Sequence, residues 1–242
     1  MARVFIGVGH GGSDPGAVGR VREADANLVI ALKLREELLR HGVTVGISRI
    51  TNELDPLAEE IREANAFGAD ICIDVHNNAG GGNGFEVYRQ TNGHAVQSER
   101  LATCISTRVD EIGQENRGVK TKLNKAGTDY FGFLRQIKAP AVIVEGFFVD
   151  SNDALGFDTI PEQQTLAVAY AKGILDYFGI SWKAPAPDEN ALFYDAVAVI
   201  ANAGIINSPA YWQDNDAYST GNVRTLIRKV ADYINRMEET AV

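Results

Sequence analysis

The first 80 residues of the chain alternate short apolar runs with longer amphipathic stretches. Apolar runs occupy residues 3–9, 43–48 and 69–76, and each is short enough to form one buried strand. Between them, residues 24–40 and 56–67 repeat apolar side chains every three or four positions, which predicts two helices. Strands that alternate with helices in this way predict an α/β domain.

The same alternation continues more loosely in the second half of this region. A strand is predicted at residues 84–88, an amphipathic helix at 96–112, a buried strand at 141–145 and a helix at 162–178. We therefore predict one large domain, residues 1–180, built as a mostly parallel twisted sheet flanked by helices.

The pattern changes after this domain. Residues 181–190 contain two prolines and have no periodicity, which is typical of a linker. Residues 191–242 return to helical spacing, with one helix that ends near Gly204 and a last helix over 222–237. We predict a small helical C-terminal module that is too short to bury much apolar surface alone.

Composition narrows the class of protein. The chain has 242 residues, 45% of them hydrophobic and 23% charged, as in soluble globular proteins. Its formal net charge of -9, without clusters of lysine and arginine, argues against a nucleic-acid partner. No run reaches the roughly 20 apolar residues of a membrane span, and the N-terminus lacks the apolar region of a signal peptide. We therefore expect a chain that is made in the cytoplasm and has no membrane partner.

Only two cysteines occur in the chain. Cys72 lies in the apolar run ICIDV, and Cys104 lies at helical spacing between Leu101 and Ile105. Free cysteine behaves as a small hydrophobic residue, so we expect both to be reduced core residues. A disulfide or a ligand role is the alternative.

Two histidines lie at the ends of predicted strands. His10 follows the first strand within the sequence GHGG, and His76 ends the third strand. The carboxyl ends of parallel strands lie at one edge of a sheet, where binding sites are built. Two histidines delivered to this edge can share a zinc ion, which binds imidazole nitrogen and accepts a carboxylate as third ligand. Glu23, at the start of the first predicted helix, is the candidate carboxylate.

Glu145 is a second acidic candidate because it ends the apolar run AVIVE. At the end of a buried strand, this carboxylate is placed to act as general base toward a metal-bound water. Taken singly, each candidate also has a structural interpretation, such as a hydrogen-bonded histidine, a charge at a helix start or an ion pair. Their joint placement at one edge favours a site. The remaining histidines lie in polar stretches and are predicted to be surface residues: His41 and His94.

Five short blocks follow one another along the chain: GHGGSDPGAVG, EADANL, ICIDVHNNA, NRGVK with YFGFLR, and PAVIVEGFF. They resemble the blocks of the zinc-dependent N-acetylmuramoyl-L-alanine amidases, the amidase type 3 family, and the resemblance covers residues 4–178. No single block is specific, whereas five in family order are. The resemblance implies an enzyme that hydrolyses the amide between N-acetylmuramic acid and L-alanine in peptidoglycan, the polymer of the bacterial cell wall.

The resemblance also assigns roles to the four candidate residues. Carried over block by block, it implies one Zn2+ per chain, held by His10, Glu23 and His76, with Glu145 as the catalytic carboxylate. Three protein ligands leave a fourth position on zinc for water, whose pKa falls toward about 7. Glu145 is then expected to accept the water proton and pass it to the leaving amine. Substrate-binding residues remain unassigned.

The chain departs from the family pattern near these residues. The family commonly has Asp-Pro where this chain has Gly7 and Val8, so a carboxylate that could orient a ligand is missing. Asn77 stands where alanine often follows the second histidine. The usual E-x-G-F becomes EGFF, and the following VDSND cannot be aligned. We expect an intact ligand set, with substrate contacts in this last loop left unassigned.

The biological setting is a further expectation. A catalytic domain without an export signal, followed by a short module, suits a phage or prophage endolysin that reaches the wall after release; a sporulation or mother-cell lysis amidase fits almost as well. Alternatives are a zinc-dependent peptidase or amidase acting on another wall peptide bond, or a non-catalytic wall-binding protein. In the tail, Tyr211 and Trp212 suggest either a wall-binding surface or helices that associate into a homo-oligomer.

Overall fold

The computed structural model describes residues 1–185, 189–203 and 221–239. The chain divides into two compact units, Met1–Lys183 and Ala184–Val242. Each unit has a hydrophobic cluster of its own.

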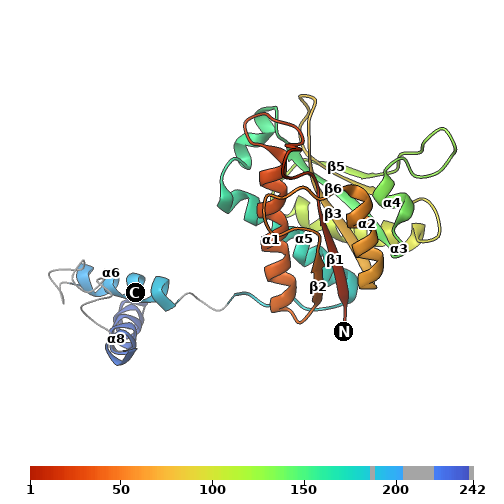
Figure 1. Ribbon diagram of the computed structural model, residues 1–242. Helices are drawn as coiled ribbons and strands as arrows, with labels where there is room; N and C mark the ends of the chain where they lie inside the picture. Colours follow the sequence, from red (N-terminus) through yellow and green to blue (C-terminus); the bar gives the residue numbers. More distant parts are fainter. Residues whose placement is uncertain (186–188, 204–220, 240–242) are drawn as a thin grey trace. The chain divides into compact units, whose positions relative to one another are not determined.

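A six-stranded sheet forms the centre of the first unit (Figure 1). Its strands lie in the order β2-β1-β3-β6-β4-β5. The first four are parallel, whereas β4 is antiparallel to β6 and parallel to β5. The predicted mostly parallel sheet is confirmed. In chain order the strands are β1 (Arg3–Val8), β2 (Thr44–Ile47), β3 (Ile71–Asn78), β4 (Phe85–Arg89), β5 (Asn116–Lys120) and β6 (Ala141–Phe148).

Helices cover both faces of this sheet. The helices α1, α3 and α5 share a cluster of buried apolar residues with one face, and α2 and α4 share another with the opposite face. Figure 1 shows α1 and α2 on opposite sides of β1. The elements are α1 (Glu23–Arg40), α2 (Leu57–Phe67), α3 (Ala95–Asp110), α4 (Gly132–Gln136), α5 (Ile160–Phe178) and a short 3-10 helix, η1 (Asn152–Gly156).

The sequence pattern missed β5 and α4. Strand β5 lies at the sheet edge and is only half-buried, so its sequence NRGVK has no apolar alternation to detect. Helix α4 is a five-residue turn of helix, too short to show helical periodicity. Helix α5 begins two residues before its predicted start because Thr159 and Glu162 form a reciprocal capping box.

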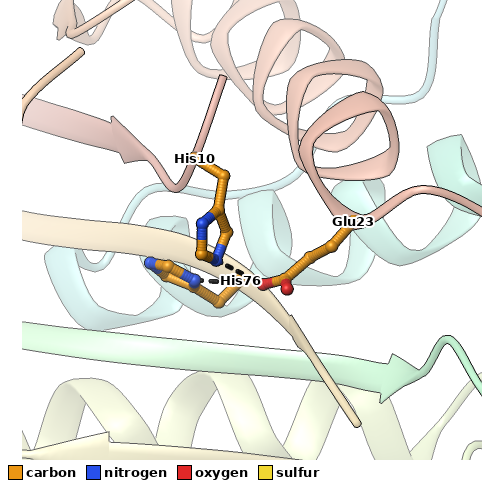
Figure 2. A group of neighbouring side chains, drawn as sticks. All are labelled: His10, Glu23 and His76. Carbon is orange, nitrogen blue, oxygen red and sulfur yellow. Dashed lines mark hydrogen bonds and ion pairs between the residues drawn. The ribbon is translucent and has the colours of Figure 1, made fainter. Parts of the chain in front are cut away.

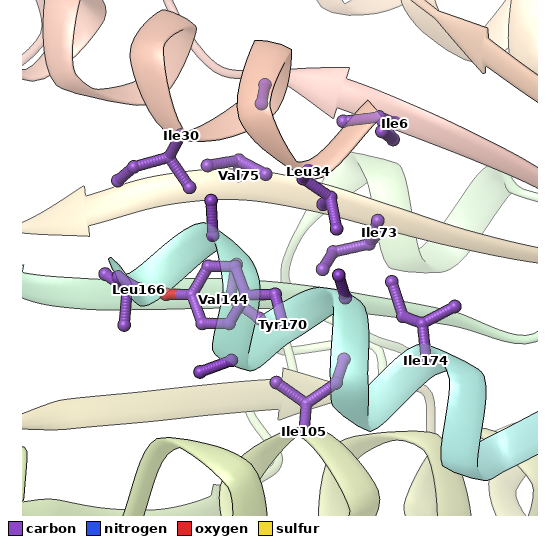
Figure 3. Packing of buried hydrophobic residues seen from close by; sticks show 14 of the residues in the cluster. Ile6, Ile30, Leu34, Ile73, Val75, Ile105, Val144, Leu166, Tyr170 and Ile174 are labelled. Atoms are coloured by element: carbon purple, nitrogen blue, oxygen red, sulfur yellow. The ribbon is translucent and has the colours of Figure 1, made fainter. Parts of the chain in front are cut away.

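The core between the sheet and α1, α3 and α5 is built mainly of aliphatic side chains. Ile73 and Val75 of β3 and Val144 of β6 are fully buried there (Figure 3). Their partners from the helices are Ile30, Leu34, Ile105, Leu166, Tyr170 and Ile174. On the opposite face, Cys72 packs with apolar residues of α2 and α4. Both cysteines are free, as expected, although Cys104 is only half-buried.

The strand order determines where a site can form. The chain passes from β1 through α1 to β2 on one side, then through α2 to β3 on the other side of β1. The connection that leaves β1 therefore runs toward β2, whereas the connection that leaves β3 runs the other way along the sheet, toward β4. Such a switch point, at the carboxyl ends of parallel strands, leaves a crevice in which ligands bind. His10 follows β1 and His76 lies in β3, so both histidines meet at this point.

The first unit continues beyond α5 to Lys183. The Trp182 ring stacks on His41 with 4.7 Å between ring centroids, and the Lys183 backbone N–H donates to His41 Nε2 at 2.9 Å. His94 is likewise half-buried, and its Nε2 contacts the Lys138 carbonyl at 2.9 Å. Both histidines, predicted to be surface residues, are half-buried, and each one links segments that are distant in sequence.

The second unit contains two described helices, α6 (Glu189–Asn202) and α8 (Gly221–Glu239). Phe193 and Val197 of α6 pack against Ile227 of α8. The predicted helix end at Gly204 and the aromatic pair Tyr211 and Trp212 lie outside the described residues, and the predicted domain boundaries remain a prediction. Of the helices that the structure describes, none is long and apolar enough to cross a membrane.

Candidate active site

The carboxyl edge of the sheet carries a row of polar side chains on the face covered by α2 and α4. His76 of β3 pairs in register with Glu145 of β6, and Glu145 pairs with Glu86 of β4. Asp74 lies two positions before His76 and so points to the same face. The antiparallel direction of β4 brings Glu86, near the start of its strand, level with residues near the ends of the others.

Three of the predicted residues converge on one point (Figure 2). Glu23 Oε1 lies 3.2 Å from His10 Nε2 and 3.1 Å from His76 Nδ1. One potential ligand atom from each residue lies within 4.8 Å of the other two. The three side chains come from the loop after β1, the first residue of α1 and strand β3. The group that the sequence predicted as a ligand set is therefore assembled.

The loop after β1 is shaped to present His10. His10 is the one described residue other than glycine with positive φ, at 64°. Buried Arg49 and Asn27 hold this loop by donating to the Gly9 carbonyl at 3.1 and 3.0 Å. A Cβ at Gly9 would lie 2.2 Å from the His76 ring, so only glycine lets β1 and this ring approach so closely.

Glu23 is fixed by hydrogen bonds from the backbone. The Ala17 N–H donates to Glu23 Oε2 at 2.9 Å, and the Asn77 N–H donates to Oε1 at 3.3 Å. Asn77 also donates from its side chain to Asn27 Oδ1 at 2.7 Å. The asparagine that departs from the family pattern therefore connects the end of β3 to the start of α1.

Each histidine has a carboxylate beside its second ring nitrogen. His10 Nδ1 lies 2.9 Å from Asp14 Oδ2, and His76 Nε2 lies 3.4 Å from Asp74 Oδ2. Metal-binding histidines usually contact a carboxylate or carbonyl in this way, which fixes the tautomer and the orientation of the ring. The carboxylate expected at position 7 is absent, and Asp14 and Asp74 stand beside the two rings instead.

The electrostatics of this group favour a positive charge at its centre. The hydrogen bond to Glu23 raises the pKa of His10. Burial opposes a charged His76, but Asp74 and Glu23 outweigh it and raise the pKa of His76 well above its ordinary value. Burial also opposes a charged Glu23, yet its contacts with the two histidines hold its pKa far below the usual range. Either protons or a metal cation can supply the positive charge.

The donor set fits zinc. Two imidazole nitrogens and one carboxylate oxygen match the ligands of catalytic zinc sites, which keep a further position for water or substrate. Each histidine directs one nitrogen to the shared point and has a carboxylate at the other. Magnesium and calcium prefer all-oxygen ligands, so the two imidazoles select against them.

Glu145 and Glu86 are neighbouring carboxylates in opposite environments. Burial opposes ionisation of Glu86, but ion pairs with Lys120 and Arg117 lower its pKa, and Arg117 Nε lies 2.6 Å from Glu86 Oε2. Among the described residues, none donates a hydrogen bond to the side chain of Glu145. Burial raises the pKa of Glu145 to about 7, helped by Glu23 and Glu86 and opposed by His76. Such a separation of pKa values marks Glu145 as the group suited to exchange protons near neutral pH.

A cavity of about 300 Å³ adjoins the two histidines on the face covered by α2 and α4. His10, His76 and Asp74 form part of its polar wall. Its apolar wall comes from the segment before α2, from the region of α4 and from β6: Leu54, Pro56, Leu57, Phe131, Phe133 and Ile143. A substrate held here would have one end beside the candidate ligand atoms.

The loop after β6, which could not be aligned from sequence, ties neighbouring loops together. Asp150 accepts hydrogen bonds from the backbone N–H groups of Gly80 and Gly81 at 2.7 and 3.1 Å. Asp153 accepts from the Gly84 and Phe148 N–H groups at 2.8 and 2.9 Å. Both aspartates of VDSND therefore fix the loop between β3 and β4, which leaves the candidate site.

The sequence prediction missed several residues of this site. Asp74 was detectable in principle, because it shares the parity of His76 within a strand. Asp14 lies four residues after His10, in a loop where spacing carries no information. Arg49 and Glu86 gave no signal, because their partners lie on other strands and loops.

An imidazole pair with one glutamate, next to a half-buried carboxylate whose pKa is raised, is the arrangement of a metal-dependent hydrolase. The family model described as "Amidase_3: N-acetylmuramoyl-L-alanine amidase" matches residues 4–176. The chain belongs to this family, and it is an N-acetylmuramoyl-L-alanine amidase that acts on peptidoglycan.

Individual relatives agree with this assignment. The sporulation-specific N-acetylmuramoyl-L-alanine amidase of Bacillus subtilis is 35% identical over 74% of this chain and 69% of its own length. The endolysin of Bacillus phage SPP1 is 34% identical over 62% of this chain and 56% of its own length. In the solved structure of the catalytic domain of CwlV, an amidase from Bacillus (Paenibacillus) polymyxa, the match covers 75% of this chain and all of that domain, with 25% identity and a TM-score of 0.67.

Proposed function

We propose that the enzyme is zinc-dependent and cleaves the amide between N-acetylmuramic acid and L-alanine, with His10, Glu23 and His76 as zinc ligands and Glu145 as general base. The convergence of two imidazole nitrogens on Glu23 Oε1 carries this proposal. The position of Glu145 supports it, since this residue pairs in register with the ligand His76.

The residues of the site have separate roles in the proposed reaction. Zinc, when bound, supplies a Lewis acid that polarises the scissile carbonyl and activates water near neutral pH. Glu145, as a carboxylate, accepts the proton of the attacking water and returns it to the amine nitrogen as the amide bond breaks. Asp14 and Asp74 hold the two imidazoles in orientation. The cavity beside the histidines holds part of the substrate.

The bond that is cleaved is tested by digesting purified peptidoglycan and analysing the products by mass spectrometry. We expect peptides with a new N-terminal L-alanine and glycan strands of unchanged length. The Glu145→Gln variant, prepared identically, is the control for contaminating hydrolases. New amino termini inside the peptide would show the alternative wall peptidase, and an inactive wild-type protein would show the non-catalytic alternative.

We further propose that the enzyme acts on the wall after release from the cytoplasm, as an endolysin or a mother-cell lysis amidase does. Its similarity to a phage endolysin and to a sporulation-specific amidase supports this setting. The test expresses the chain in a bacterium whose wall it digests in suspension. Lysis is expected only after the membrane is permeabilised; lysis without permeabilisation would contradict the proposal.

For the second unit we propose a role in binding the wall or in self-association. The inactive Glu145→Gln chain and the same chain ending at Lys183 can be compared for co-sedimentation with intact walls and for molecular mass in solution. Loss of wall binding on truncation supports the first role, and a fall from dimer to monomer supports the second. A truncated chain that is unchanged in both measurements would reject both roles.

A further inference from the structure

Two buried carboxyl groups meet above Gly7, outside the group of candidate ligands. Gly7 of β1 pairs in register with Asp74 of β3, and Glu60 reaches the same place from α2. A Cβ at Gly7 would lie 1.9 Å from Glu60 Oε1 and 2.8 Å from Asp74 Oδ1. The missing side chain of Gly7 therefore provides the space in which Glu60 and Asp74 come together.

In the described part of the chain, one oxygen of each carboxyl group has no partner other than the facing carboxyl group. Glu60 is 4% exposed and Asp74 is 2% exposed, so water solvates them poorly even though both border the cavity beside the histidines. Among the described residues, no hydrogen-bond partner reaches Glu60 Oε1 or Asp74 Oδ1 when both groups are charged. Two such oxygens left unpaired would be costly. A proton on Glu60 turns their contact into a hydrogen bond, and burial together with the charge of Asp74 raises the pKa of Glu60 well above its usual value.

The second oxygen of Asp74 connects this pair to the candidate ligands. Asp74 Oδ2 lies 3.4 Å from His76 Nε2, and the opposite nitrogen, His76 Nδ1, lies 3.1 Å from Glu23 Oε1. A continuous path of contacts thus runs from α2 through β3 to the candidate metal position. In the described part of the chain, Glu60 is the one group placed to give Asp74 a hydrogen bond on the side away from His76.

We propose that Glu60 is a positioning residue of the metal centre, which holds the Asp74 carboxylate against His76 Nε2 in the space left by Gly7. His76 is thereby kept in the ring orientation that presents Nδ1 to the metal. This inference rests on the proposed function, because it requires that His76 binds zinc. It also assigns an orienting group to a chain that has glycine where its family commonly has aspartate.

Zinc affinity of the full-length chain, measured by competition with a chromophoric chelator, tests this role. Glu60→Leu keeps the volume and removes the hydrogen bond, and we expect zinc binding to weaken about 10–100-fold, as for other groups behind metal ligands. Glu60→Gln can still donate to Asp74 from its amide, and its affinity should stay within about twofold of wild type. Glu59→Leu is the matched control, because Glu59 neighbours Glu60 on the exposed side of α2.

A second variant and a spectroscopic measurement guard against a folding defect. In Gly7→Ala the new Cβ would collide with Glu60 Oε1 and displace it, so we expect weaker zinc binding although Glu60 itself is unchanged. The d–d spectrum of the cobalt-substituted protein should change in Glu60→Leu and Gly7→Ala, and stay unchanged in Glu60→Gln and Glu59→Leu.

Several results would overturn the inference. Wild-type zinc affinity in both Glu60→Leu and Gly7→Ala would do so, as would a Glu60→Gln variant impaired as strongly as Glu60→Leu. A change in KM with unchanged zinc affinity would instead assign Glu60 to the substrate cavity that it lines. His76→Ala separates this inference from the proposed function. If that variant loses zinc while Glu60→Leu retains it, the inference alone fails; if His76→Ala retains zinc, the ligand assignment fails first.

Discussion

The two faces of the central sheet are made by the same strands and differ in chemistry near its carboxyl edge. Toward α1, α3 and α5, alternate residues of β3 and β6 are isoleucine and valine up to Val75 and Val144, and Asn77 follows at the carboxyl edge. Toward α2 and α4, the intervening residues begin apolar, with Cys72 and Ala141, and become polar at the carboxyl edge, with Asp74, His76 and Glu145. One face therefore stabilises the fold while the other carries the site.

The difference follows from the period of two along a strand. Successive side chains of a strand point to opposite faces, so a substitution at one residue alters one face and a substitution at the next residue alters the other. We call the face toward α2 and α4 the site face. At its carboxyl edge the residues lie next to the loops after β1 and β3, where a ligand can reach them. Stability and catalysis can thus be altered separately by adjacent residues of one strand, and the variants below test this separation.

The largest effect is expected when a candidate ligand on the site face is removed. His76→Ala and, separately, His10→Ala should yield folded protein that no longer retains zinc and no longer digests peptidoglycan, because only two protein ligands remain. Elemental analysis of dialysed protein measures the metal, with circular dichroism as the check on folding. Zinc content equal to wild type in either variant would contradict the ligand set.

Removing the carboxylate of Glu145, the proposed proton acceptor, should impair catalysis without weakening zinc binding. Glu145→Gln keeps the shape of the side chain, so we expect zinc content and melting temperature to be retained. Release of N-terminal L-alanine should fall about 10²–10⁴-fold, the usual contribution of a general base. Turnover of a soluble muramoyl peptide gives the rate. A variant that digests walls at nearly the wild-type rate would remove Glu145 from the mechanism.

A substitution on the apolar face, toward α1, α3 and α5, should lower stability and leave zinc binding and catalysis unchanged. Ile73 lies in β3 one residue before Asp74 and is fully buried among α1, α5 and β6. We expect Ile73→Ala to lower the free energy of unfolding by about 2–5 kcal/mol through lost burial and a residual cavity. Its zinc affinity and kcat at low temperature should remain near wild type. Urea unfolding measures the first quantity; a large loss of zinc affinity would show that the faces are not independent.

The pH dependence of activity is the mildest test of the site face. Burial raises the pKa of Glu145 to about 7, so at lower pH this group is protonated and cannot accept a proton. Activity therefore rises with pH, about tenfold per unit on the acidic side, and then levels off. A bound zinc ion adds positive charge nearby, which lowers the pKa of Glu145 and moves this acidic limb below pH 7. An activity that falls steadily as pH rises from 5 to 7 would contradict the assigned role.

Local periodicity was enough to predict much of this molecule. Apolar runs gave β1, β3 and β6, and with them the edge at which His10, His76 and Glu145 meet. Short or half-exposed elements, such as β5 and α4, lack enough buried positions to show a period. The antiparallel direction of β4 also escaped prediction, because a strand has the same alternation of side chains in either direction.

The sequence by itself determined the α/β class, the site edge and the four candidate residues, because a strand or helix repeats its side chains at a fixed period and family blocks lie in a fixed order. Tertiary structure decided which groups act on those residues. The pairing of Gly7 with Asp74, the approach of Glu60 to Asp74 above Gly7 and the contrast between Glu86 and Glu145 all depend on register and on packing across the sheet. The register between two strands is set because each strand must bury one whole face against the core. This depends on the neighbouring strands and helices, so no local stretch of sequence contains it.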